Sequence, residues 1–294
     1  IHLEHRKVKN NSVIVVLADF SPNSIALMIA LIKKKAIIVP LSSSINSKKN
    51  VFISISKPDF QIKIKNNDEI SIKFLDKRSN NKLYKKLKIN DKPGLVLFSS
   101  GSTGKSKASV HDLSFLLKKF LKPRKTLITI TFLLFDHIGG INTLFYILSN
   151  AGTIVTTEDR RPKSVLKLID RYKIELLPTS PTFLNLLLIS EEYKNFNLKS
   201  LKIISYGTEP MPQTTLNKLS LLFPEIIFKQ TYGLSEVGIL QSKSESSDSL
   251  WLKVGGKDNK TRIINSMLEI KSKSAMLGYL NAPSPFTTDG WFKT

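Results

Sequence analysis

Two short apolar runs separated by a helix start constrain the fold of this chain. Residues 13–18 contain only Val, Ile, Leu and Ala, as do residues 36–39, and Pro40 is expected to end the second run. Between the runs, Ser21 and Pro22 are typical of a helix N-cap and first turn. Two apolar strands joined by a helix form the strand–helix–strand unit of a parallel sheet, whose strands are buried on both faces.

The alternation of strand and helix continues to about residue 236. Further strands are predicted at 95–98, 126–134, 153–157, 174–177, 201–205 and 226–230, and further helices at 113–121, 142–148, 162–172, 183–190 and 213–222. The region 51–76 contains half-exposed strand segments, and the Lys-rich region 77–92 is expected to be a surface connection. We therefore predict an α/β fold: layered parallel sheets flanked by helices over about 1–236, then a β-rich, barrel-like subdomain over about 237–294.

Composition narrows the class of protein. The 294 residues include no Cys, which excludes disulfides and thiolate nucleophiles and fits a reducing compartment. The formal net charge of +22 comes mostly from Lys spread along the chain, so we expect no nucleic-acid partner, although anions such as nucleotides should be attracted. No apolar run is long enough to span a bilayer and no signal peptide is visible, so we expect a cytoplasmic protein without a membrane span.

A loop of small and hydroxylated residues follows the predicted strand at 95–98. It reads Ser99-Ser100-Gly101-Ser102-Thr103-Gly104-Lys105-Ser106-Lys107, and a helical pattern begins at Leu113. Small residues let backbone N–H groups approach an anion closely, hydroxyls add donors, and Lys107 adds positive charge. Strand, loop and helix start together predict a phosphate site, although a plain flexible turn has the same composition.

Three more unusual loops follow predicted strands, at 135–140, 205–212 and 230–236. Ligands of open parallel sheets bind in crevices outside the carboxyl ends of the strands. We therefore expect the four loops to meet at one site.

In combination, these loops resemble the motifs of the adenylate-forming superfamily, which contains acyl-CoA synthetases, adenylation domains of peptide synthetases and luciferases. Residues 99–108 are similar to its phosphate loop, Thr-Ser-Gly-Ser/Thr-Thr-Gly-x-Pro-Lys-Gly, with Ser106 for Pro and Ala108 for Gly. Residues 232–236 are similar to Tyr-Gly-x-Thr-Glu, and residues 207–210 to the adenine-side loop. Collinear similarities at 31–41, 254–264, 278–280 and 289–294 extend the resemblance over nearly the whole chain.

The resemblance implies ATP-dependent activation of a carboxylic acid to an acyl-adenylate, with Mg²⁺, and transfer to CoA or to a carrier-protein thiol. The carboxylate, the triphosphate and the pyrophosphate leaving group are all anionic, so such a site must neutralise charge and align the groups. It also implies that residues 1–294 are the core of a large N-terminal domain truncated at both ends. A small C-terminal lid domain with a further Lys is then expected to lie outside this sequence.

The resemblance assigns roles to individual residues. The nucleotide-binding set is Ser99, Ser100, Gly101, Ser102, Thr103, Gly104, Lys107, Gly207, Thr208, Glu209, Gln230, Thr231, Tyr232, Gly233 and Ser235. The acid-binding set is Phe135, Asp136, His137, Gly139 and Gly207. His137, Lys107 and Glu236 are the catalytic candidates, and Glu236 and Thr103 are the Mg²⁺ ligands, since hard cations prefer oxygen donors.

The loop at 135–140, which the resemblance assigns to the acid, contains residues typical of two subfamilies. His137 matches acyl-CoA synthetases, whereas the pair Phe135-Asp136 matches peptide-synthetase domains, in which the Asp binds the substrate amine. The following Gly139-Gly140 favours a simple carboxylic acid. A hydrogen-bonded residue at a helix start is the structural alternative for His137.

Two alternatives for the function stay open. Gly104-Lys105-Ser106 resembles the end of the P-loop motif of NTPases, in which Lys105 would bind phosphate, although Ser99 stands where the first Gly belongs. The other is a catalytically degenerate nucleotide-binding relative, because Ser106 and Ala108 depart from the family pattern.

Overall fold

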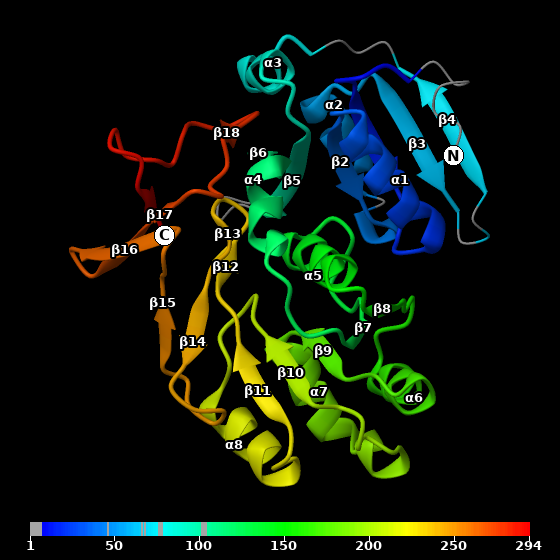
Figure 1. Ribbon diagram of the computed structural model, residues 1–294, viewed down its shortest axis with the longest axis vertical. Helices are drawn as coiled ribbons and strands as arrows, with labels where there is room; N and C mark the ends of the chain where they lie inside the picture. The colour runs from blue at the N-terminus through cyan, green and yellow to red at the C-terminus, as the bar shows by residue number, and fades with distance from the viewer. Residues whose placement is uncertain (1–7, 46, 66, 68, 76–78, 101–104) are drawn as a thin grey trace.

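The computed structural model describes residues 8–45, 47–65, 67, 69–75, 79–100 and 105–294. Four residues of the predicted phosphate loop, Gly101, Ser102, Thr103 and Gly104, therefore lie outside the described residues. Two large sheets with helices on their faces, followed by small antiparallel sheets, form the molecule (Figure 1), which confirms the predicted fold class. None of the helices in the described part of the chain is long and apolar enough to cross a membrane.

The first sheet has seven strands in the order β18-β6-β5-β2-β1-β3-β4. These are β1 (Val13–Leu17), β2 (Ile37–Leu41), β3 (Phe60–Ile64), β4 (Ile70–Phe74), β5 (Gly94–Ser100), β6 (Ser106–Asp112) and β18 (Gly278–Tyr279). The four central strands are parallel, whereas β4, β6 and β18 pair antiparallel. Helix α1 (Pro22–Lys33) covers one face of this sheet, and α2 (Lys49–Ser56) and α3 (Lys82–Ile89) cover the other. The apolar residues of α1 belong to one core cluster, and those of α2 and α3 belong to another.

The predicted unit β1–α1–β2 is present, with one difference at its end. Ser21 caps α1: its hydroxyl accepts from the N–H of Ser24, whose hydroxyl accepts from the N–H of Ser21. Pro40, however, lies inside β2, opposite Val16. Strand β2 pairs with β5 only at its first two residues, so no partner on that side requires the N–H that Pro40 lacks.

The second sheet is parallel throughout, in the order β11-β10-β9-β7-β8. Its strands are β7 (Ile128–Ile130), β8 (Thr153–Val155), β9 (Leu176–Thr179), β10 (Ile203–Tyr206) and β11 (Ile227–Gln230). Helices α6 (Pro162–Tyr172), α7 (Pro181–Ser190) and α8 (Gln213–Leu222) pack on it through one apolar core. Helix α5 (Ile138–Ser149) lies between the two sheets, with Ile138 and Ile141 in the core of the first (Figure 1).

The C-terminal part consists of small antiparallel sheets rather than one continuous barrel. Strands β12 (Gly233–Leu234) and β13 (Gly238–Ile239) pair, as do β14 (Ser242–Ser244) and β15 (Leu252–Val254). A three-stranded sheet contains β16 (Asn259–Ile264), β17 (Met267–Ser272) and β19 (Phe292–Lys293).

The predicted order of strand, loop and helix around residues 99–107 is wrong. Strands β5 and β6 form an antiparallel hairpin, in which Ser99 lies opposite Lys107 and Gly94 opposite Asp112. Helix α4 (Leu113–Leu117) starts only after β6, at the far end of the hairpin. Helix α4 therefore does not point its N-terminus at the phosphate end of the hairpin, where Ser99 and Lys107 supply a hydroxyl and a positive charge.

Two helices were not predicted from the sequence: α2 at 49–56, and α3 within the predicted surface connection 77–92. In α3, Asn81 caps the first turn and only Tyr84 and Leu87 are buried. The interleaved Lys residues leave this apolar stripe too narrow to stand out in the sequence.

His111 is a polar residue in the core of the first sheet. It lies on β6 with no exposed surface, and within the described part of the chain neither ring nitrogen has a hydrogen-bond partner of normal geometry. Burial lowers the pKa of His111 to about 4, although the backbones of Ser235 and Ser274 favour the protonated ring. The imidazole is therefore neutral in the folded protein at neutral pH.

This buried histidine should make the protein sensitive to acid. Between about pH 6.5 and pH 4 the unfolded chain binds a proton at His111 that the folded chain excludes, so the free energy of unfolding should fall as pH falls. We expect a loss of about 3 kcal/mol across this window, measured by urea unfolding. His111→Gln should lose most of this dependence; an unchanged dependence in that variant would contradict the assignment.

Candidate functional site

A cavity of about 620 Å³ opens where the β5–β6 hairpin, the carboxyl ends of β9 and β10, the start of α5 and the C-terminal strands meet. The predicted site residues that line it are Ser99, Lys107, His137, Gly139, Gly207, Thr208, Thr231, Gly233, Ser235 and Glu236. All four predicted loops thus contribute to one cavity, whose volume is in the range of small-molecule sites, roughly 300–1,000 Å³.

The hairpin contributes Ser99 and Lys107, which are opposite each other on β5 and β6. Lys107 is half-buried at the cavity, whereas Lys105 is exposed near the tip of the hairpin and does not line the cavity. The P-loop alternative is therefore wrong, because that motif needs a helix directly after the loop and the lysine at the ligand.

A second hairpin contributes Ser235 and Glu236, which lie in the turn between β12 and β13. The Tyr279 hydroxyl donates a hydrogen bond of 2.6 Å to Oε1 of Glu236. Tyr279 also lines the cavity, and the Nζ atom of Lys107 lies 5.5 Å from the centroid of its ring. In the sequence, Tyr279 is recognisable only as part of the segment 278–280 that resembles the family, because a contact across the sheet leaves no signal in the residue's own segment.

His137 is both the N-cap of α5 and part of the cavity wall. Its Nδ1 accepts the N–H of Gly139 at 3.0 Å. Burial lowers the pKa of His137 despite the opposing effect of Asp136. A neutral ring whose Nδ1 accepts must carry its proton on Nε2, so the side chain can donate one hydrogen bond to a ligand.

The loop after β10 is held in a strained conformation against the loop after β11. A Cβ atom on Gly207 would lie 2.6 Å from Oγ1 and 2.8 Å from the carbonyl oxygen of Thr231. Thr208 has a φ of 75°, a left-handed conformation that is unusual for a β-branched residue. Such strain is concentrated at ligand sites.

Two residues of the predicted acid-binding set point elsewhere. Phe135 is 1% exposed and packs in the core of the first sheet, where its ring makes a T-shaped contact with that of Phe20. Oδ2 of Asp136 accepts hydrogen bonds from the backbone N–H and the hydroxyl of Ser42, at 2.9 and 2.8 Å. Asp136 therefore ties the end of β2 to the start of α5, and its carboxylate does not line the cavity.

Three residues of the predicted nucleotide-binding set also lie outside the cavity. Glu209 accepts the N–H of Thr182 at 2.7 Å, at the start of α7. Gln230 is not among the residues that line the cavity, and its buried Oε1 has no hydrogen-bond partner among the described residues. Tyr232 packs against the apolar cluster of the C-terminal part, where burial raises its pKa. The side chain of Ser100 is not described.

The donor set at the cavity fits Mg²⁺ only together with a nucleotide. Within the described residues, no three His, Asp or Glu side chains lie close enough to hold a metal ion. Glu236 is the carboxylate of the cavity, and the other predicted ligand, Thr103, lies outside the described residues. Mg²⁺ is commonly held by one or two carboxylates plus substrate phosphates, so one carboxylate is sufficient beside a triphosphate.

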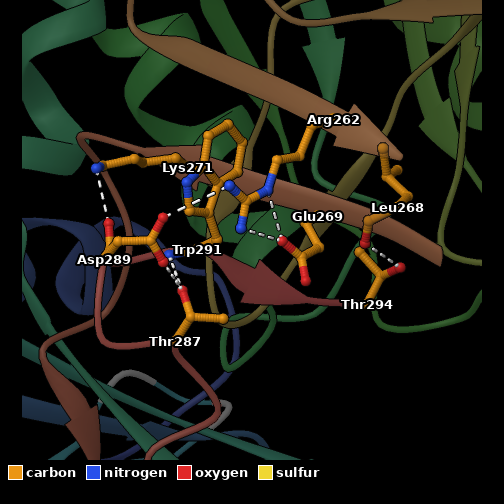
Figure 2. A network of polar contacts seen from close by, with 8 residues as sticks. All are labelled: Arg262, Leu268, Glu269, Lys271, Thr287, Asp289, Trp291 and Thr294. Atoms are coloured by element: carbon orange, nitrogen blue, oxygen red, sulfur yellow. Dashed lines mark hydrogen bonds and ion pairs between the residues drawn. The ribbon is translucent and has the colours of Figure 1, made fainter. Parts of the chain in front are cut away.

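The C-terminal strand β19 and Thr294 complete the cavity wall, and a polar network holds them in place (Figure 2). Both the N–H and the hydroxyl of Thr294 donate to the carbonyl oxygen of Leu268. Arg262 forms a salt bridge of 2.6 Å with the buried Glu269, and its guanidinium lies 4.2 Å from the ring centroid of Trp291. Trp291 directly precedes β19, so these contacts hold β19 in its position beside the cavity.

Comparison with known proteins assigns this chain to a family. Residues 2–257 match the family model described as AMP-binding enzyme. The chain therefore belongs to the AMP-binding enzyme family, within the adenylate-forming superfamily.

Individual relatives are distant. The chain is 25% identical to a 4-coumarate–CoA ligase-like protein of Oryza sativa over 68% of this chain and 40% of that protein. It is 22% identical to the D-alanine–D-alanyl carrier protein ligase of Staphylococcus haemolyticus over 95% of this chain and 63% of that protein. The structure superimposes on ATP-bound MatB from Rhodopseudomonas palustris with a TM-score of 0.76 and 17% identity, over 99% of this chain and 67% of that one. The chain thus spans less than two thirds of the length of these curated relatives.

The placement of Asp136 gives a test of its role. Asp136→Ala should lower the free energy of unfolding by about 2 kcal/mol, because two hydrogen bonds to a carboxylate are lost, and should leave ATP affinity unchanged. Asp170→Ala, which removes an exposed ion pair with Lys173, is the control and should cost less than about 1 kcal/mol. Loss of ligand affinity at unchanged stability would instead place Asp136 in the binding site.

Proposed function

We propose that this chain forms the nucleotide- and acid-binding core of a ligase that activates a carboxylic acid with ATP. The observation that carries the proposal is the meeting of Lys107, His137 and Glu236, from three separate loops, at one cavity. Each of these groups suits one part of the reaction, and the family membership supports the assignment.

The hairpin side of the cavity is assigned to the triphosphate. Lys107 supplies positive charge and Ser99 a hydroxyl donor for phosphate oxygens. Glu236, with Thr103 as predicted second ligand, would hold Mg²⁺, which when bound neutralises phosphate charge and polarises the phosphoryl oxygens. Ser235 lies beside Glu236 and is assigned to the α-phosphate.

The α5 side of the cavity is assigned to the acid. The Nε2–H of His137 can donate to one carboxylate oxygen and thereby orient the other oxygen toward the α-phosphorus. A new bond forms between that oxygen and the α-phosphorus, and the bond from the α-phosphorus to the bridging oxygen breaks, so pyrophosphate leaves with its electron pair. Leu133, Ile138 and Pro178 supply apolar wall on this side.

The acceptor of the acyl group is proposed to be a thiol, of CoA or of a carrier protein. The names of the rice and staphylococcal relatives, a CoA ligase-like protein and a carrier-protein ligase, support these two classes. The thiolate sulfur would attack the acyl carbonyl carbon and AMP would leave. We further propose a cytoplasmic location and a division of the chain near residue 236 into α/β layers and a β-rich part.

The proposal is tested by release of pyrophosphate from ATP in the presence of a panel of carboxylic acids. Acid-dependent release by the longest natural form of the protein supports an active ligase. Binding of ATP without release for any acid would indicate a degenerate nucleotide-binding relative instead.

The two lysines of the hairpin provide a matched pair of variants. Lys107→Ala should weaken binding of Mg²⁺·ATP by about tenfold or more, because a charge-assisted contact to phosphate is lost. Lys105→Ala removes the same charge from an exposed position and should change the Kd less than about threefold at physiological salt. Calorimetric titration measures both, and a larger effect at Lys105 would contradict the assignment.

A further inference from the structure

Residues 277–281, from the C-terminal part of the chain, attach to the strand that carries Lys107. Strand β18 pairs antiparallel with β6, with Gly278 opposite Val110 and Tyr279 opposite Ser109. The N–H of Leu280 donates to the carbonyl oxygen of Ala108 at 2.9 Å. The edge of the first sheet is thus closed by a segment about 170 residues away in sequence.

The side chain of Asn281 extends this pairing past the end of β18. Its Oδ1 accepts the N–H of Ala108 at 3.0 Å, and its Nδ2 donates to the carbonyl oxygen of Ser106 at 2.9 Å. Ser106 and Ala108 are the two neighbours of Lys107. The amide of Asn281 therefore holds the backbone on both sides of the lysine.

Tyr279 contacts both the positive and the negative group of the cavity. Its hydroxyl donates to Glu236 at 2.6 Å, while its ring lies 5.5 Å from Nζ of Lys107. A phenol hydroxyl is a hydrogen-bond donor, so this contact satisfies one oxygen of the carboxylate. In addition, the carbonyl oxygen of Glu236 accepts the N–H of Met276 at 2.7 Å, so the same segment also fixes the backbone of that turn.

This arrangement keeps the two charges apart. Among the described residues, no salt bridge joins Lys107 to Glu236. A direct pair would compensate both charges and leave neither free for a phosphate or a cation. The neutral phenol satisfies one carboxylate oxygen and leaves the other available.

We propose that Tyr279 is a positioning residue that holds Glu236 for the cation and keeps Lys107 free for phosphate. Asn281 supports it by fixing the strand on either side of Lys107. This inference rests on the proposed function, since it assumes that Mg²⁺·ATP occupies the cavity.

Two substitutions of Tyr279 separate its hydroxyl from its ring. Binding of ATP is measured by calorimetry in the presence of chelator and again with Mg²⁺ added. Tyr279→Phe keeps the ring, so ATP binding without metal should stay within about twofold, while the enhancement by Mg²⁺ should fall about tenfold, as expected for a lost hydrogen bond to a charged group. Tyr279→Ala removes the spacer as well and should weaken ATP binding under both conditions.

A double-mutant cycle with Glu236→Gln distinguishes positioning from a general structural effect. If Tyr279 acts through Glu236, Tyr279→Phe should have no further effect on Mg²⁺ enhancement in the Glu236→Gln background. Tyr172→Phe, on the exposed side of α6, is the control and should match the wild type. Full additivity of the two changes, or a Tyr279→Phe variant indistinguishable from wild type, would overturn the inference.

Asn281→Ala provides a second route if Tyr279→Ala does not fold. It should weaken ATP binding without metal about fivefold or more, because the backbone around Lys107 loses two hydrogen bonds, and should preserve the Mg²⁺ enhancement. Unchanged ATP binding would overturn the role of the segment. If the wild-type chain binds no ATP under either condition, the proposed function is contradicted, and the inference with it. If the wild type binds ATP and the variants bind it equally well with the same Mg²⁺ enhancement, only the inference is contradicted.

Discussion

The antiparallel pairing of β5 with β6 is the interaction on which the rest of the site depends. It joins the parallel core of the first sheet to β6, the strand next to the edge strand β18, with Val96, Ala108 and Val110 fully buried in a shared cluster. The same register that buries these residues sets Ser99 opposite Lys107 at the cavity. A slip of one residue would turn Lys107 to the other face of the sheet, so core packing and ligand binding are specified together.

The hairpin also determines how the site can attract an anion. Because α4 begins at the far end of β6, the dipole of this helix is not directed at the phosphate end of the hairpin. The charge of a triphosphate must therefore be balanced by Lys107, by loop donors and by a cation at Glu236. Only a small part of the chain's net charge of +22 takes part, since most lysines lie on the surface, where salt screens them.

The sequence predicted the local elements of the second sheet better than those of the first. Helices at 162–172 and 213–222 have the observed bounds, because each has a clear apolar stripe and a distinct start. Strand β6 was missed because 106–112 mixes polar residues with few apolar ones, yet it is buried by β5 and β18. The roles of Asp136 and Tyr279 depend on partners far away in sequence, Ser42 and Glu236. No local pattern encodes such contacts, so motif matching placed the right loops at the cavity but could not decide which side chain of each loop faces it.

The central claim is that one cavity holds the nucleotide at the hairpin and the acid beside α5. It can be tested by calorimetric titration with a non-hydrolysable acyl-adenylate mimic, followed by competition with Mg²⁺·ATP. One mimic should bind per chain and be displaced by Mg²⁺·ATP, and its binding should be weaker in the Lys107→Ala variant. Binding of neither ligand, or simultaneous binding of both without competition, would contradict it.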